Sequence, residues 1–194
     1  MDHFNQQMFA WLAAGYEPQS VLLALSRLLA DGGGWLAFAG VAWVAWRKPS
    51  RFGYLLCAVA VAGLAALAAH ALAAFINHPR PFMVGLSPAY VSHAARGSLP
   101  SAHATVLWTL ACICLQRLNL LSLGLWVSAC ALATCWARIY AGIHFPLDIL
   151  AGMGLGATLA VAFGVARLVV LRGLALLRLA VGHPPAPGLR TLGS

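Results

Sequence analysis

The sequence is poor in charge, and acidic residues are the scarcest of all. Only 8% of its 194 residues are charged, and only four are Asp or Glu. The twelve Lys and Arg residues raise the formal charge to +8, but they form no basic run with interleaved aromatic residues. Such runs are typical of nucleic-acid binding. We therefore expect no nucleic-acid partner, and membrane topology accounts better for the basic balance.

The cysteines have no partners that could hold a metal. All five lie in apolar segments, with no His or carboxylate at metal-ligand spacing beside them: Cys57, Cys112, Cys114, Cys130 and Cys135. A secreted disulfide framework or a zinc site requires a different pattern. We expect these residues to be small members of a hydrophobic core.

Apolar residues dominate what remains. They make up 62% of the chain, and the mean hydropathy is +0.85. This composition predicts a polytopic membrane protein, an all-α bundle of five to six helices without a separate soluble domain. The expected spans are residues 19–46, 53–76, 100–115, 120–137 and 146–171. The first contains Asp31-Gly-Gly-Gly34, and we favour one kinked span over two short helices.

Three regions follow from this pattern. Residues 1–17 are expected to contain an amphipathic helix at the membrane interface, since apolar residues recur there at helical spacing. Residues 18–171 are the transmembrane bundle. Residues 172–194 are a basic, Pro-containing cytoplasmic tail. Within the bundle, residues 77–99 form a long polar connection whose prolines rule out a continuous helix, and a loop of this length favours function.

The basic residues assign the two faces of the membrane. If the spans alternate, six of them fall on one side, which the positive-inside rule makes cytoplasmic: Arg47, Lys48, Arg51, Arg117, Arg172 and Arg178. The opposite face then receives the 77–99 connection, the start of the third span and the segment from Arg138 to Asp148. We expect this polar face to lie on the outer side of the membrane.

Three short segments on that face carry an oxyanion-binding inventory. Arg80 and Arg138 offer forked donors that match phosphate oxygens, and Ser101 opens a helix whose first N–H groups are unpaired. Asp148 lies one helical turn beyond His144 and can orient its ring. The other ring nitrogen of His144 is then left as a basic lone pair.

His103 completes the set, because it can protonate a leaving oxygen. Each residue also has a structural interpretation: Arg80 as an interface anchor, Ser101 as a helix cap, His103 as a satisfied polar side chain, and His144 with Asp148 as a structural pair. Together, on one face of the membrane, they favour a functional site.

In order, the segments read Arg-Pro, then Pro-Ser-x-His, then Arg-x5-His-x3-Asp. This order resembles the three-part signature of the membrane type 2 phosphatidic acid phosphatases, whose fold is related to the vanadium haloperoxidase core. The phrases HPRPF, LPSAHAT and RIYAGIHFPLD are most similar to bacterial undecaprenyl pyrophosphate phosphatases of this type.

The resemblance implies a role for each residue. His144 would be the nucleophile that forms a phosphohistidine, Asp148 would orient it, and His103 would be the general acid. The phosphoryl oxygens would be held by Arg80, Ser101, the backbone of Ala102, and Arg138. No cofactor and no metal is implied, and a single nearby Asp could not build a magnesium site.

One departure from the family concerns its first motif. A Lys usually stands seven residues before the Arg, and this position is Ala73, while Lys48 is the only lysine in the chain. His78, His93 or Arg96 could supply the missing charge, and we hypothesise that His78 does.

Two smaller departures carry less weight. Ala137 replaces a common Ser, which removes at most one hydroxyl donor. Ala102 replaces the usual Gly at a position that acts through its backbone.

The function predicted from sequence is hydrolysis of a lipid (pyro)phosphate, with undecaprenyl pyrophosphate as the favoured substrate and membrane lipids as surroundings. Close alternatives are a phosphatidylglycerophosphate phosphatase and a phosphotransferase acting on lipid A. An alternative of another class is a transporter or binding protein for anionic lipids. A transporter would distribute its polar residues through the depth of the spans, whereas here they gather at one end, which counts against this alternative. No protein partner is predicted.

Overall fold

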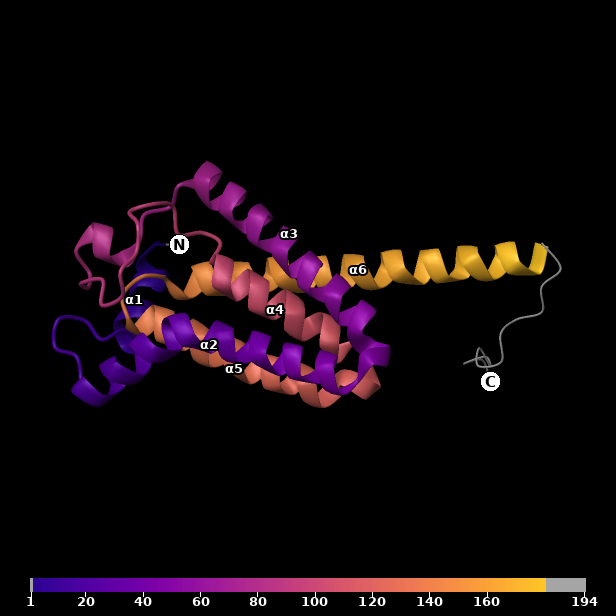
Figure 1. Cartoon of the computed structure of the whole chain (residues 1–194). Coiled ribbons are helices and arrows are strands. Elements are labelled where there is room, and N and C mark those ends of the chain that lie inside the picture. Colours follow the sequence, from indigo (N-terminus) through magenta and orange to yellow (C-terminus); the bar gives the residue numbers. More distant parts are fainter. Residues whose placement is uncertain (1, 181–194) are drawn as a thin grey trace.

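The structure is a computed structural model that describes residues 2–180, and over that range it contains six α-helices and no strand (Figure 1). The helices are α1 (Asp2–Leu12), α2 (Ser20–Arg47), α3 (Phe52–Ile76), α4 (Ala102–Leu115), α5 (Leu121–Tyr140) and α6 (Pro146–Ala180). Three short 3-10 helices join them: η1 (Pro49–Arg51), η2 (Pro81–Val84) and η3 (Leu118–Leu120). The predicted all-α bundle is confirmed.

Two helix boundaries bear on the predictions. α2 runs without a break through Asp31 and the three glycines, so the expectation of one span is confirmed. α6 continues past residue 171, where the tail was expected to begin, and ends at Ala180. The remainder of the predicted tail, residues 181–194, lies outside the described residues. In Figure 1 the last part of α6 projects beyond the other helices.

The helices differ in whether they are long enough to span a membrane. Four helical segments are long and apolar enough to span one: Ser20–Arg47, Pro49–Val84, Leu118–Tyr140 and Pro146–Leu179. α4 has only 14 residues, about 21 Å at 1.5 Å per residue, against a hydrocarbon core of ~30 Å. The chain is a membrane protein, and α4 is shorter than the hydrocarbon core is thick.

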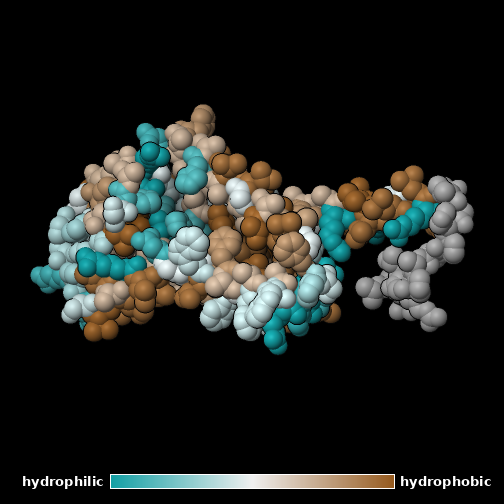
Figure 2. Space-filling view, in the orientation of Figure 1, coloured by the Kyte–Doolittle hydropathy of each residue, from teal (hydrophilic) through white to brown (hydrophobic). Residues whose placement is uncertain are grey.

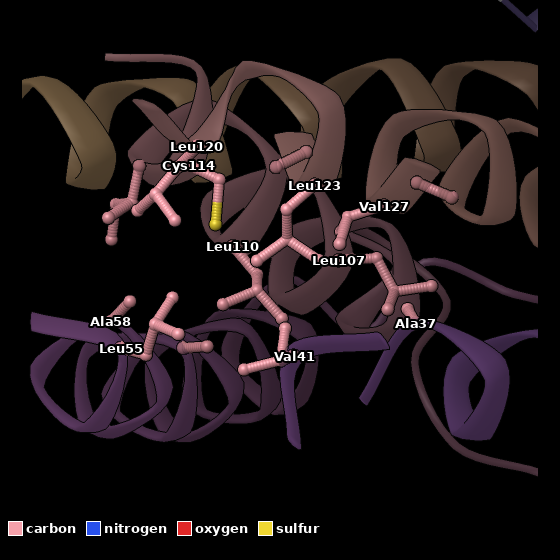
Figure 3. Packing of buried hydrophobic residues seen from close by; sticks show 14 of the residues in the cluster. Ala37, Val41, Leu55, Ala58, Leu107, Leu110, Cys114, Leu120, Leu123 and Val127 are labelled. Carbon is pink, nitrogen blue, oxygen red and sulfur yellow. The ribbon is translucent and has the colours of Figure 1, made fainter. Parts of the chain in front are cut away.

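The hydrophobic core surrounds α4. Leu107, Leu110 and Ile113 are each 1% exposed or less, because α4 has neighbours on several sides. They form one cluster with Val41 of α2, Leu55 of α3, and Leu123 and Val127 of α5 (Figure 3). Close-packed aliphatic side chains of this kind leave α4 little freedom to shift.

Glycine brings α6 close to α4. A Cβ at Gly152 would lie 2.7 Å from the Ser101 carbonyl oxygen, and one at Gly156 would lie 2.7 Å from that of Thr105. These two glycines are four residues apart, the spacing that lets helix backbones approach in membranes. The first turns of α4 and α6 are therefore held side by side, and Ser101 N–H donates to the Asp148 carbonyl at 3.0 Å.

α1 packs on this same end of the bundle. Its Phe9 is buried against Phe145, with ring centroids 5.4 Å apart, and the side-chain oxygen of Asn5 accepts the Leu147 N–H at 3.2 Å. Because Leu147 lies in the first turn of α6, Asn5 supplies one of the acceptors that a helix start lacks. Phe4, Trp11 and Leu12 remain exposed, which suits the predicted interfacial placement.

Polar surface lies at the two ends of the bundle. Figure 2 shows hydrophilic residues over the end that carries α1 and the connection from α3 to α4, a second hydrophilic group toward the opposite end, and hydrophobic residues over the middle. The starts of α4 and α6 lie at the end that carries α1, which we call the polar end (Figure 1).

Candidate functional site

The three predicted segments meet at the polar end of the bundle. α3 ends at Ile76, its C-cap residue Asn77 adopts the left-handed conformation at φ 48°, and the chain then turns into the Pro79-Arg80-Pro81 segment. Ser101, which precedes α4, is joined to the first turn of α6 by its N–H bond to the Asp148 carbonyl. The arrangement brings Arg80, Ser101, Arg138, His144 and Asp148 to one buried region.

His144 and Asp148 form the centre of this region. His144 Nδ1 lies 3.4 Å from Asp148 Oδ2, and the two residues are 3% and 1% exposed. The same carboxylate oxygen accepts the Phe145 N–H at 2.8 Å, so it also caps the start of α6, as an acid in the first turn can. A carboxylate held in this way favours the tautomer with the proton on Nδ1 and leaves Nε2 with a free lone pair.

Arg80 faces that lone pair. Its Nη1 lies 3.2 Å from His144 Nε2 and donates to the Ile143 carbonyl at 2.8 Å. Nε donates to the Arg96 carbonyl at 2.9 Å and Nη2 to the Gly97 carbonyl at 3.1 Å. The guanidinium is thus fixed by backbone oxygens and carries its charge, without an acidic partner in contact, beside the ring of His144.

Arg138 reaches the site from the end of α5. It is 1% exposed, and its Nη1 donates to the Ala30 carbonyl of α2 at 2.9 Å and lies 3.9 Å from Asp31 Oδ1. A buried guanidinium costs free energy unless its donors are used. One carbonyl and a long contact to an exposed carboxylate leave donors of Arg138 available.

Three buried polar atoms in this region have no hydrogen-bond partner among the described residues: Ser101 Oγ, Arg138 Nε and Asp148 Oδ1. Ser101 is the N-cap residue of α4, yet its side chain makes no capping bond. Leaving such a group unpaired costs ~1–3 kcal/mol. Two of these atoms belong to residues predicted to bind phosphate, and a phosphoryl group would satisfy them.

His93 and His144, which lie in connections between helices, both have lowered pKa values. Burial lowers the pKa of His144 well below 6.5, and the charges of Arg138 and Arg80 lower it further. Burial, followed by the charge of Arg80, lowers the pKa of His93 to about 4. The ring centroids of His93 and His144 are 6.1 Å apart. His144 is therefore neutral near pH 7, the form in which an imidazole can attack.

His103 lies in the first turn of α4 and faces a different space. With Asp31 and His70 it provides the polar part of a pocket of about 290 Å³ between α2, α3 and α4. The rest of the lining is mainly apolar: Gly34, Trp35, Phe38, Ala66, Ala102, Val106 and Leu107. A group bound at Ser101 would thus have His103 on the side that opens toward an apolar pocket.

His78, the hypothesised replacement for the missing lysine, lies beside Ser98 and Asp148. Its Nδ1 lies 3.1 Å from Ser98 Oγ and 3.7 Å from Asp148 Oδ1, and its ring packs edge-on against Phe145. It also lines a small pocket beside α1. His78 is therefore a neighbour of the Asp148 carboxylate.

A larger pocket, of about 460 Å³, lies beside Arg80, and Ala73 is among its lining residues. Among the described residues no cluster of three or more His, Cys, Asp or Glu side chains is arranged to hold a metal ion.

Sequence reasoning missed several supporting residues. Ser98 is fully buried, and its hydroxyl donates to the His78 carbonyl at 3.1 Å. Gly97 packs directly on the Ala73 carbonyl, where a Cβ would overlap it. This contact delivers the Gly97 carbonyl to Arg80. The G-x-x-x-G spacing of Gly152 and Gly156 could have been found in the sequence, whereas the contacts of Asn5 and Ser98 have no local signal.

The all-helical membrane bundle and the residues at its polar end are typical of a family of membrane proteins, which the comparison with known families identifies. Residues 53–171 match the family described as the PAP2 superfamily, which covers more than half of the chain. The chain therefore belongs to the PAP2 superfamily, and the predicted resemblance is confirmed.

Individual relatives agree with this assignment. The protein "Putative undecaprenyl-diphosphatase YbjG" of Escherichia coli (strain K12) is 41% identical over 78 residues, which span 39% of this chain and 38% of that protein. The fold is also similar to two crystal structures. One is LpxE of Aquifex aeolicus, with a TM-score of 0.61 and 22% identity over 80% of this chain and 92% of that one.

The other is the PAP2 type phosphatidylglycerolphosphate phosphatase of Bacillus subtilis, with a TM-score of 0.62 and 20% identity over 83% of each chain. At these identities the two structures establish the fold alone.

Proposed function

We propose that the protein is an integral membrane phosphatase that hydrolyses undecaprenyl pyrophosphate to undecaprenyl phosphate and inorganic phosphate, and so recycles the carrier lipid of the cell envelope. The observation that carries the proposal is the contact of His144 with both Asp148 and Arg80, at 3.4 Å and 3.2 Å. A neutral, oriented imidazole beside a fixed guanidinium is suited to attack a phosphoryl group.

In the first step, His144 Nε2 attacks the terminal phosphorus. The P–N bond forms as the bond from phosphorus to the bridging oxygen breaks, and His103 donates its proton to the departing lipid phosphate. Asp148 stabilises the charge that develops on the His144 ring. Arg80, Arg138, Ser101 and the N–H groups at the start of α4 bind the equatorial oxygens, where charge is spread during phosphoryl transfer.

In the second step, water attacks the phosphohistidine. His103 accepts the proton of that water, the P–N bond breaks, and inorganic phosphate leaves with His144 restored. Positioning and charge stabilisation carry most of the rate enhancement in such a reaction. We propose that these side chains and backbone N–H groups suffice without a metal ion.

The placement of the two pockets supports a lipid substrate. The head group would lie against Arg80 and His144, and the polyprenyl chain would leave through the apolar pocket between α2 and α3, on the side of His103. The distribution of basic residues favours a site that faces the periplasm, with the protein in the cytoplasmic (inner) membrane. The printed name of the Escherichia coli relative supports the choice of substrate.

The test is phosphate release by the purified protein in detergent. Undecaprenyl pyrophosphate, phosphatidylglycerophosphate and phosphatidic acid are compared at equal concentrations, with and without a chelator. We expect release to be fastest from undecaprenyl pyrophosphate and unchanged by chelator. Preference for another lipid would overturn the substrate, and loss of activity on chelation would overturn the metal-free site.

A further inference from the structure

Ala73, the position at which the family has a lysine, lines a pocket. Ala73 and His70 lie three residues apart on α3, so they share one face of the helix, and both line the 460 Å³ pocket beside Arg80. A lysine at position 73 would extend into this space. With Ala73 small, the space is lined from the opposite side by His93 and Arg96 of the α3–α4 connection.

The charge of this pocket has one sign. Of the described residues that line it, four are Arg or His and none is acidic. Arg80 is buried with its charge held by carbonyl groups, while His70 and Arg96 are exposed and His93 is half-buried. An anion that entered would meet fixed positive charge from Arg80 and hydrogen-bond donors from both imidazoles.

His70 also lines the apolar pocket that contains His103. It therefore stands where the two pockets adjoin, between the phosphoryl-binding region and the space assigned to the lipid chain. With its terminal phosphate beside His144, a diphosphate head group would extend its second phosphate toward this junction. A monophosphate bound at His144 would have no second phosphate to place there.

We propose that His70 and His93 together replace the family lysine and bind the lipid-proximal phosphate of a diphosphate, which makes them the residues that select lipid diphosphates over monophosphates. This inference rests on the proposed function for the location of the terminal phosphate. Both residues act in binding, and His144, Asp148 and His103 remain the reacting groups.

The experiment measures binding, so that it does not depend on turnover. Methylenediphosphonate, which cannot be hydrolysed, and inorganic phosphate are titrated into the full-length protein in detergent by calorimetry. The wild type is compared with H70A/H93A, with H70A/H93A carrying Ala73→Lys, and with His3→Ala. His3 is an exposed histidine on α1 and serves as the matched control. H70Q/H93Q provides a second variant if the alanine variant does not fold.

We expect wild type and His3→Ala to bind the diphosphonate more tightly than phosphate. The double variant should lose about tenfold or more in diphosphonate affinity and less than about threefold in phosphate affinity. Ala73→Lys should restore most of the loss, because it returns a fixed charge to the same pocket. Equal weakening of both ligands, or none, would overturn the proposal.

The two proposals fail separately. A protein that prefers the diphosphonate through His70 and His93 but releases no phosphate from any lipid would contradict the proposed function alone. A protein that releases phosphate from undecaprenyl pyrophosphate with unchanged ligand preference in the double variant would contradict only the role of the two histidines.

Discussion

Two helix pairs of this bundle are built in opposite ways. α4 packs closely on α6 at Gly152 and Gly156, where the α4 backbone leaves no room for a side chain. α2 and α3 make few contacts with each other, and a pocket lined by Trp35, Phe38 and Ala66 lies between them and α4. The first pair is closed and the second is open.

The difference suggests separate roles for the two pairs: one positions the proposed reacting groups, and the other admits the substrate. The closed pair holds Ser101, His144 and Asp148 in a fixed relation, which the catalytic role proposed for them would require. The open pair borders the apolar pocket that His103 lines, and we propose that the lipid chain lies there. Changes on the closed side should therefore affect folding and the rate of reaction, while changes on the open side should affect the choice of lipid.

The largest effect is expected from closing the space that glycine leaves on α6. Gly156→Leu places a side chain against the α4 backbone at Thr105 and Thr109, and we expect loss of both folded protein and phosphatase activity. Gly154→Leu is the matched control, because a Cβ at Gly154 would meet nothing within 4 Å. Monodispersity on size exclusion and phosphate release measure the two outcomes. Equal tolerance of both variants would contradict the close contact.

Asp148→Asn should be the next most damaging change. The amide can no longer stabilise the charged ring of His144 and favours the wrong tautomer, so we expect kcat to fall by roughly 10²–10⁴-fold with little change in KM. Steady-state kinetics measure the split. A change in KM alone would show that Asp148 serves only as the cap of α6.

The pH dependence of the rate follows from His144. Its pKa is lowered below 6.5, chiefly by burial, so the neutral, attacking form persists at pH 6.5 and is lost only as the pH falls through the lower value. We expect the acidic limb of kcat/KM to lie below pH 6.5, with a slope of about tenfold per pH unit. A limb at or above pH 6.5 would contradict the buried environment.

On the open side, Ala66→Trp should fill part of the pocket between α2 and α3. We expect KM for undecaprenyl pyrophosphate to rise about tenfold while that for a short-chain diphosphate changes less than about threefold. Leu64→Trp, on the exposed surface of α3, controls for the added indole. An equal rise in KM for both substrates would show that the polyprenyl chain does not pass through this pocket.

The smallest effect is expected from Asp31→Asn. Asp31 is exposed and lies 3.9 Å from Arg138, and exposed ion pairs at such distances contribute little. Arg138 keeps its bond to the Ala30 carbonyl. We expect activity within about threefold of wild type, and a loss of a hundredfold in the phosphate-release assay would show that Asp31 positions Arg138.

The sequence sufficed to predict the all-α bundle and the family, because hydropathy and motif spacing are local properties. The structure brings the predicted site segments together, and the roles of their residues stay a prediction. It could not predict that Asn5 accepts a bond from the start of α6, since those residues lie 142 positions apart. His78 shows the same limit. Its position near Arg80 in the sequence suggested it as the replacement for the lysine. The structure places its ring 3.7 Å from Asp148 Oδ1, while His70 and His93 line the pocket at Ala73.

In the proposed mechanism, Nε2 of His144 is the atom that receives the phosphoryl group. Substrate labelled with ³²P at its terminal phosphate, mixed with the protein and quenched within one turnover, tests this directly. We predict a protein-bound label that is stable in base and released by acid, as a phosphohistidine should be, and that is absent from His144→Ala. Label that survives acid, or that persists in His144→Ala, would contradict it.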